Sequence, residues 1–301
     1  MTDAAQNATR TRAEDSPLPE PTLLARTLRT LSGNRTGVIG FVLVALIVAS
    51  AVLAPWITPY DPAAIMTGPR MSPPTAEHWL GTDNIGRDIF SRVIAGGRIA
   101  MLVAAAALGA ALSAGLALGL IAGLGPRWLD NIMLLVFDAL RSFPVIVFGL
   151  AVVTIIGPSL FTVILVVAIT SIPIYARIVR TQTMALRNAE FILAERAMGA
   201  GMARILLVHV LPNVLGPLLI LASMDVPLVI ATEAGLSFLG MGVRPPTPSW
   251  GVILNDGYNF IRNSPWPVIG GSVPIILVTL GFTFMGEALR DIFDPKLRKT
   301  G

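Results

Sequence analysis

IAMLVAAAALGAALSAGLALGLIAG, residues 99–123, contains no charged side chain. A helix of this length, rising about 1.5 Å per residue, is long enough to cross the hydrocarbon core of a bilayer. Gly115, Gly119 and Gly123 recur in it at four-residue spacing. This spacing places the three glycines on one helix face, where small residues let a second helix approach closely in lipid. The stretch predicts a membrane-spanning helix with a close neighbour.

The composition of the whole chain extends this prediction. Of the 301 residues, 54% are hydrophobic and 13% are charged, whereas an ordinary soluble domain has about a quarter charged residues. A soluble core of this size cannot hide that apolar surplus, so lipid must solvate part of it. We therefore expect an all-α protein that crosses the membrane several times.

Other functional classes find little support in the composition. The net charge of +4 could indicate nucleic acid, but the Arg residues flank apolar runs and form no basic stripe, so we expect no nucleic-acid partner. The absence of Cys excludes disulfides, and two distant histidines speak against a His-based metal site. Neither Lys296 nor Lys299 follows a glycine-rich loop, so no Walker A phosphate site is present.

Six apolar runs predict six membrane spans, at residues 37–57, 99–123, 129–156, 159–176, 205–232 and 267–289. Residues 1–36 form a polar tail with a short amphipathic helix near 23–31. A cleaved signal peptide is the alternative for the first run, but the polar segment before it is too long, so we expect an uncleaved anchor.

The positive charges predict the orientation. With six spans, the side that carries both termini collects 15 of the 22 Arg and Lys residues and the other side collects 6, with Arg141 inside a span. Because positive residues accumulate in cytoplasmic segments, both termini are expected in the cytoplasm, with the tail 290–301. The connections 58–98 and 233–266 are then extracytoplasmic, and 177–204 is cytoplasmic.

The cytoplasmic connection 177–204 predicts a short capped helix. Asn188 is a suitable N-cap, Glu190 places an anion in the first turn, and Gly199 can end the helix in the left-handed conformation. Phe191, Ala194 and Met198 share one apolar face, which is ringed by Glu190, Glu195 and Arg196. The helix either docks into a groove of a partner protein or lies flat on the bilayer.

Three ionisable residues fall inside predicted spans and should face protein or water. Asp138 and Arg141 are three residues apart. They either pair on one helix face beside Pro144 or line a pathway. Asp225 has no partner in its own helix, and either lines a pathway or pairs with another subunit.

Residues 187–213, RNAEFILAERAMGAGMARILLVHVLPN, resemble the EAA loop of ABC-importer permeases in its dipeptide and oligopeptide form. The Gly of that motif corresponds to Gly199 and its closing Leu-Pro to residues 211–212. The first Glu of the motif falls on Leu193 and its second Ala on Glu195. Further segments from residue 31 onward resemble the C-type peptide permease subunit: 78–88 (HWLGTDNIGRD), 233–242 (EAGLSFLGMG), 245–251 (PPTPSWG) and 286–295 (GEALRDIFDP).

The resemblance implies a type I ABC-importer permease in a bacterial inner membrane, with a core at residues 99–289. It implies a second, homologous permease subunit, two ATPase subunits that bind ATP and Mg, and an extracytoplasmic binding protein that delivers dipeptides or oligopeptides. This chain would be non-catalytic, without a cofactor of its own. The loop 177–204 would couple to the ATPases through Asn188, Glu190, Phe191, Ala194, Glu195, Arg196, Met198, Gly199 and Arg204.

The resemblance also suggests roles for the remaining candidates. Asp225 could meet the amino terminus of a peptide in the pathway. The binding protein could contact charges and aromatic anchors of the outer connections, or these residues could simply brace the spans. The contact candidates are Asp83, Arg87, Asp88, Trp250 and Tyr258.

Two other readings of the function remain open. A secondary carrier coupled to protons or sodium would have only Asp225 and Asp138 as ion-site candidates, and a related importer could carry a metal chelate instead of a peptide. An intramembrane enzyme ranks last, because no catalytic constellation stands out.

Overall fold

The computed structural model describes residues 34–293. The expected amphipathic helix near 23–31 and the end of the C-terminal tail, 294–301, lie outside the described residues. Within the described part the chain is helical, and its elements are α3 (Arg35–Ile57), α4 (Ile89–Leu124), α5 (Arg127–Arg141), α6 (Val145–Ile156), α7 (Leu160–Arg187), α8 (Glu190–Ala197), α9 (Met202–Arg204), the π-helix η1 (Ile205–Val210), α10 (Leu211–Phe238), α11 (Trp250–Tyr258) and α12 (Trp266–Phe293).

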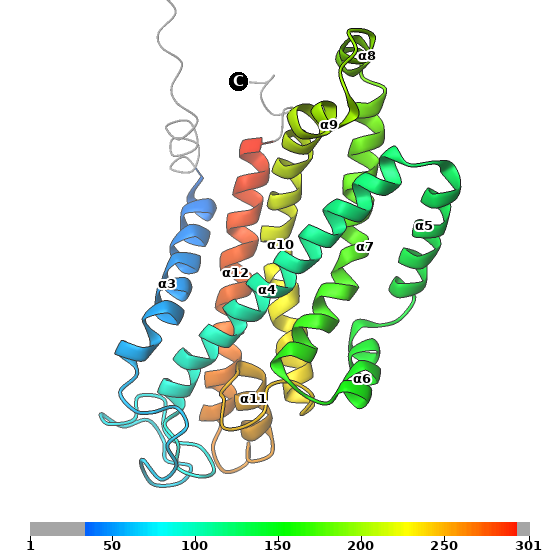
Figure 1. Cartoon of the computed structure of the whole chain (residues 1–301). Helices are drawn as coiled ribbons and strands as arrows, with labels where there is room; N and C mark the ends of the chain where they lie inside the picture. The colour runs from blue at the N-terminus through cyan, green and yellow to red at the C-terminus, as the bar shows by residue number, and fades with distance from the viewer. Residues whose placement is uncertain (1–33, 294–301) are drawn as a thin grey trace, which may run out of the picture.

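Five long helices form the bundle seen in Figure 1: α3, α4, α7, the continuous stretch of α9, η1 and α10 (Met202–Phe238), and α12. Each is long and apolar enough to cross a membrane, and the pair α5 and α6 adds a sixth crossing if it is counted as one span. The predicted number of spans therefore holds with that pair as the sixth.

The third predicted span, 129–156, is sharply broken at the kink expected beside Pro144. The structure breaks it between Arg141 and Val145, and α5 and α6 are bent by 89° relative to each other. Pro144 explains the break, because proline has no N–H for the helix ladder and disfavours a helical conformation of the residue before it.

Several helices extend beyond the apolar runs that predicted them. α4 begins at Ile89 rather than at residue 99, because the Asp88 carboxylate accepts a hydrogen bond from the Ser91 N–H (2.7 Å) and caps the helix there. α7 continues to Arg187, well past residue 176. Hydropathy detects only the part of a helix that lipid surrounds, so charged turns at the ends escape it.

The glycine stripe of α4 packs against α7, as its spacing predicts. A Cβ atom on Gly115 would lie 2.6 Å from the Tyr175 Cβ, and one on Gly123 would lie 2.8 Å from the Thr183 Cβ. The two helices therefore touch almost backbone to backbone, which only glycine permits.

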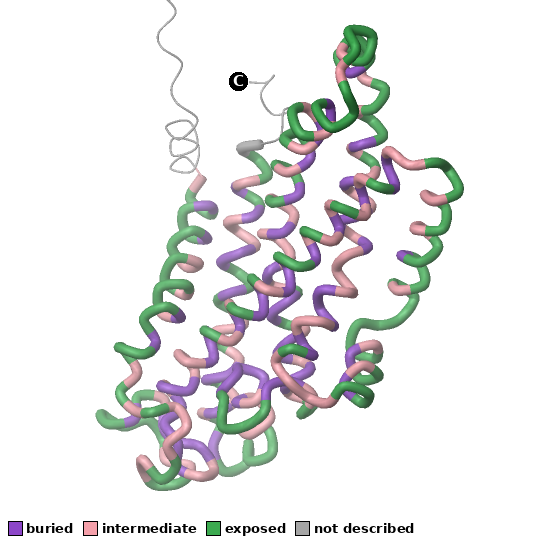
Figure 2. The backbone as a smooth tube through the Cα atoms, viewed as in Figure 1, coloured by how far each residue is buried: buried purple, intermediate pink, exposed green. Residues whose placement is uncertain are grey.

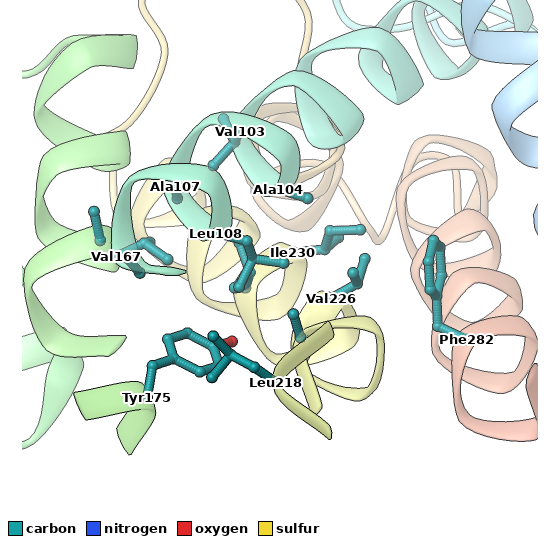
Figure 3. Packing of buried hydrophobic residues seen from close by; sticks show 14 of the residues in the cluster. Val103, Ala104, Ala107, Leu108, Val167, Tyr175, Leu218, Val226, Ile230 and Phe282 are labelled. Carbon is teal, nitrogen blue, oxygen red and sulfur yellow. The ribbon is translucent and has the colours of Figure 1, made fainter. Parts of the chain in front are cut away.

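The apolar core lies where α4, α7 and α10 meet. Figure 3 shows Val103 and Leu108 of α4 facing side chains of the other two helices, including Val167 and Ile230. Buried positions cluster toward the middle of the bundle and exposed ones lie on its outside (Figure 2). The exposed set is rich in large apolar side chains, as expected of a surface that lipid covers.

The two ends of the bundle differ. One end, which we name the α8 end, carries α8 together with the start of α3 and the end of α12 (Figure 1). The opposite end, the α11 end, carries α11 and the connection 58–88. The two limits of the described chain therefore lie on the same side as α8, as expected for an even number of crossings.

Candidate functional site

The helix α8 stands at the tip of the hairpin between α7 and α9 (Figure 1). Gly199 lies just beyond it with φ +83°, which confirms the predicted left-handed end. The prediction of Asn188 as N-cap is wrong. Asn188 is the C-cap of α7, and the extended residue Ala189 precedes α8 without a side-chain cap. Asn188 thus serves the preceding helix, and Glu190 remains in the first turn of α8.

The predicted apolar face of α8 is exposed. Phe191 is 47% exposed and Met198 is 76% exposed, and Ala194 is exposed between them. Leu193 adds a further exposed apolar side chain that the prediction omitted. Glu190 and Arg196 are also exposed, so the helix presents an apolar patch with charges around it.

Three side chains fix α8 to the body of the protein. Ile192 is fully buried and belongs to the apolar core. Glu195 lies 3.9 Å from the Arg204 Nε and 3.5 Å from the His209 Nε2, and the Phe191 ring stands edge-on to the His209 ring at 5.9 Å. Ile192 and His209 were not among the predicted site residues. The spacing of Ile192 opposite the exposed face could have indicated its burial.

Two ion pairs connect α5 to α7. Asp130 accepts hydrogen bonds from two nitrogen atoms of the Arg180 guanidinium, and Asp138 pairs with Arg177. The predicted pair of Asp138 with Arg141 is therefore wrong, because the nearer guanidinium comes from the neighbouring helix.

Arg141 and Asp225 instead line one cavity of about 240 Å³. The Tyr175 Oη donates a hydrogen bond to the Asp225 Oδ2 (2.7 Å), which links α7 to α10 beside this cavity. The remaining lining consists of Leu140, Phe143, Pro144, Val145, Val167, Thr170, Ser171, Ile174, Leu228, Val229 and Thr232.

The lining of the cavity follows a helical pattern that the sequence contains. On α7 it comprises residues 167, 170, 171 and 174, and on α10 residues 225, 228, 229 and 232. Each set has the i, i+3, i+4, i+7 spacing of one helix face. Both faces mix apolar side chains with hydroxyl groups, so the sequence shows each face by itself, while only the structure shows that the two faces meet at one cavity.

The α11 end holds a buried network of charges. The Asp83 carboxylate accepts hydrogen bonds from the Arg87 Nε and the Arg92 Nη1, both at 2.6 Å, and Asp256 of α11 binds the same two guanidinium groups at 2.8 and 3.1 Å. Burial raises the pKa of the Asp256 carboxyl, and the charge of Arg87 opposes that shift. Arg92 and Asp256 were not among the predicted residues. The network ties the start of α4 to α11.

Four of the five contact candidates are buried, which agrees with the alternative that they brace the spans. Asp83, Arg87 and Asp88 are at most 8% exposed, because they form ion pairs or cap α4. Asp88 also binds the His78 Nδ1 at 2.9 Å. Trp250 is 2% exposed, and its Nε1 donates a hydrogen bond to the Val93 carbonyl. These four side chains brace the spans, and Tyr258 is exposed at 63%.

Comparison with known proteins shows which family this chain resembles. Residues 115–299 match the family described as "Binding-protein-dependent transport system inner membrane component", and residues 22–74 match "N-terminal TM domain of oligopeptide transport permease C". The dipeptide transport system permease protein DppC of Alkalihalophilus pseudofirmus is 38% identical, over 94% of this chain and 95% of the relative. The oligopeptide transport system permease protein OppC of Bacillus subtilis is 36% identical, over 88% of this chain and 87% of the relative. The di/tripeptide transport system permease protein DppC of Pseudomonas aeruginosa is 35% identical, over 95% of this chain and 96% of the relative. Together with the apolar helices of the bundle, these matches establish that the chain belongs to the family of binding-protein-dependent inner-membrane transport components.

Proposed function

We propose that this chain is a permease subunit of an ATP-binding-cassette importer that takes up dipeptides or oligopeptides. The relatives named as peptide permeases align with it over nearly its whole length. The observation that carries the coupling part of the proposal is α8, a short helix with an exposed apolar face at the tip of a hairpin. Membership of the family of binding-protein-dependent transport components favours an ATP-driven importer over an ion-coupled carrier.

α8 is well placed to act as a coupling helix. It follows directly on α7 and precedes the start of α10, and both helices line the cavity that contains Asp225. Because Ile192 anchors α8 in the apolar core beside α7 and α10, a force on α8 is passed to these two helices in the proposal. An ATPase that binds α8 differently in two states would thus bias the pathway between two conformations.

The orientation follows from this role. In the proposal the α8 end faces the cytoplasm, where two ATPase subunits bind ATP and Mg. The α11 end faces outward and receives the peptide-binding protein, with the exposed Tyr258 as a contact candidate. A homologous second permease subunit completes the pathway.

The docking proposal is tested by placing charge at two exposed apolar positions of α8 and its C-cap. Leu193→Glu and Met198→Glu should abolish co-purification of the ATPase subunits, because a carboxylate in an apolar groove pays a desolvation cost without a partner. Both side chains are more than half exposed, so the permease fold should tolerate the changes. Ile65→Glu, at an equally exposed position of the α11 end, is the matched control and should leave co-purification intact. Normal ATPase binding by both α8 variants would contradict the docking role.

A further inference from the structure

We propose that Arg141 and Asp225 form a subsite that binds the two charged termini of a short peptide during translocation. Arg141 receives the carboxylate and Asp225 receives the amino group. The proposal rests on the proposed transport function. It states that the pathway recognises the two charged termini of the peptide. The subsite would lie in the cavity that both residues line.

The first argument is that neither charge has an ion-pair partner among the residues that the structure describes. The two carboxylates of α5, Asp130 and Asp138, have guanidinium partners on α7. In residues 34–293, by contrast, no ion pair involves Arg141 or Asp225. A charge within a membrane span is expensive unless it meets water, an opposite charge or a ligand. Two opposite charges kept separate along one cavity suit a ligand with two opposite charges.

The second argument concerns the anion-binding half. Arg141 ends α5, and after the break at Pro144 the 12-residue helix α6 begins at Val145, which also lines the cavity. No side chain caps the N-terminus of α6. Its free N–H groups and the helix dipole favour an anion on the same side as the guanidinium. Non-helical backbone at membrane depth is tolerated where it lines such a cavity.

The third argument concerns the cation-binding half. The Tyr175 Oη holds the Asp225 Oδ2 at 2.7 Å, which fixes the orientation of the carboxylate. Within the described chain the structure shows no hydrogen bond to the Asp225 Oδ1, so this oxygen remains available to a ligand ammonium group. Thr232 lies two helical turns away on the same face of α10.

The remaining lining predicts which part of the cargo is selected. Apart from the two charges, it consists of apolar side chains and the hydroxyl groups of Thr170, Ser171 and Thr232. Such walls discriminate weakly between peptide side chains. The subsite therefore selects for free termini and tolerates many side chains, while a peptide with a blocked terminus leaves one of the two cavity charges without a partner.

The experiment uses substrate protection of engineered thiols in the purified transporter complex. The native chain contains no Cys, so Val145→Cys and Thr232→Cys each place a single thiol of this chain on the cavity wall. A water-soluble methanethiosulfonate modifies the thiol, and the modification of this chain is quantified by mass spectrometry. The probes are alanyl-alanine and its N-acetylated and C-amidated forms. Arg127→Cys, at the exposed first residue of α5, which has no role in the proposal, is the control thiol.

Alanyl-alanine should slow modification at least tenfold at both cavity thiols and leave the Arg127→Cys rate unchanged. Either blocked form should protect at least fivefold less. Adding Asp225→Asn or Arg141→Gln should remove the protection, and Asp138→Asn, which lies outside the cavity, should retain it. Equal protection by free and blocked peptides, or no protection by any of them, would overturn the subsite. ATPase co-purification is scored on the same samples, so a failure of the coupling role is seen separately.

Discussion

At the scale of single residues, Asp83 is a buried carboxylate with several hydrogen-bond partners. It binds Arg87 and Arg92 and also accepts the backbone N–H groups of Ile85 and Arg87, at 3.0 Å each. Asp83→Asn should destabilise the α11 end by about 3–5 kcal/mol, because it leaves buried guanidinium charge uncompensated. A thermal melt and limited proteolysis of the connection 58–88 measure the effect. Glu77→Gln, an exposed carboxylate in the same connection, is the control and should melt like the wild type.

Gly199 allows a test in which sterics play no part. An added Cβ would meet no atom within 4 Å, so the cost of Gly199→Ala lies only in its φ of +83°, about 1–2 kcal/mol. We expect the end of α8 to loosen and the affinity for the ATPase subunits to fall roughly five- to tenfold. Gly201→Ala is the matched control, since that glycine also has open space but a φ of −70°. Equal affinities in the two variants would show that the left-handed turn does not matter.

At the scale of elements, the contact of α4 with α7 depends on missing side chains. A Cβ on Gly119 would lie 2.6 Å from the Val179 Cβ, whereas one on Gly109 of the same helix would meet nothing within 4 Å. Gly119→Ala should therefore destabilise the bundle by about 1–3 kcal/mol through overpacking. Gly109→Ala should be neutral or slightly stabilising, because alanine favours helix. Unfolding of both variants by titrated detergent compares them, and equal stability would contradict the tight packing.

The two ion pairs between α5 and α7 should differ in strength. The Asp130 and Arg180 side chains are 14% and 20% exposed, whereas Asp138 is 67% exposed. Asp130→Asn should cost roughly 1.5–3 kcal/mol and Asp138→Asn less than about 1 kcal/mol, because Asp130 accepts two hydrogen bonds from its guanidinium partner and Asp138 accepts one. The same detergent titration measures both, and an equal or reversed order would refute the ranking.

At the scale of the whole molecule, the proposed orientation is open to chemical labelling. Tyr258→Cys at the α11 end should react with a membrane-impermeant maleimide on intact spheroplasts, because that residue is exposed and proposed to face outward. Ala197→Cys on α8 should react only after the membrane is permeabilised. The opposite pattern would place α8 outside, where no ATPase could reach it.

The sequence by itself determined the helical class, the number of spans, the short helix before Gly199 and the close approach along Gly115, Gly119 and Gly123. These features depend on local properties, namely hydropathy, helical spacing and the conformational freedom of glycine. The tertiary structure alone decided that Asp138 pairs with Arg177, that Asp83 and Arg87 are buried, and that Arg141 shares a cavity with Asp225. Such partnerships depend on which helix faces meet across long stretches of chain, and spacing along one helix contains no information about them.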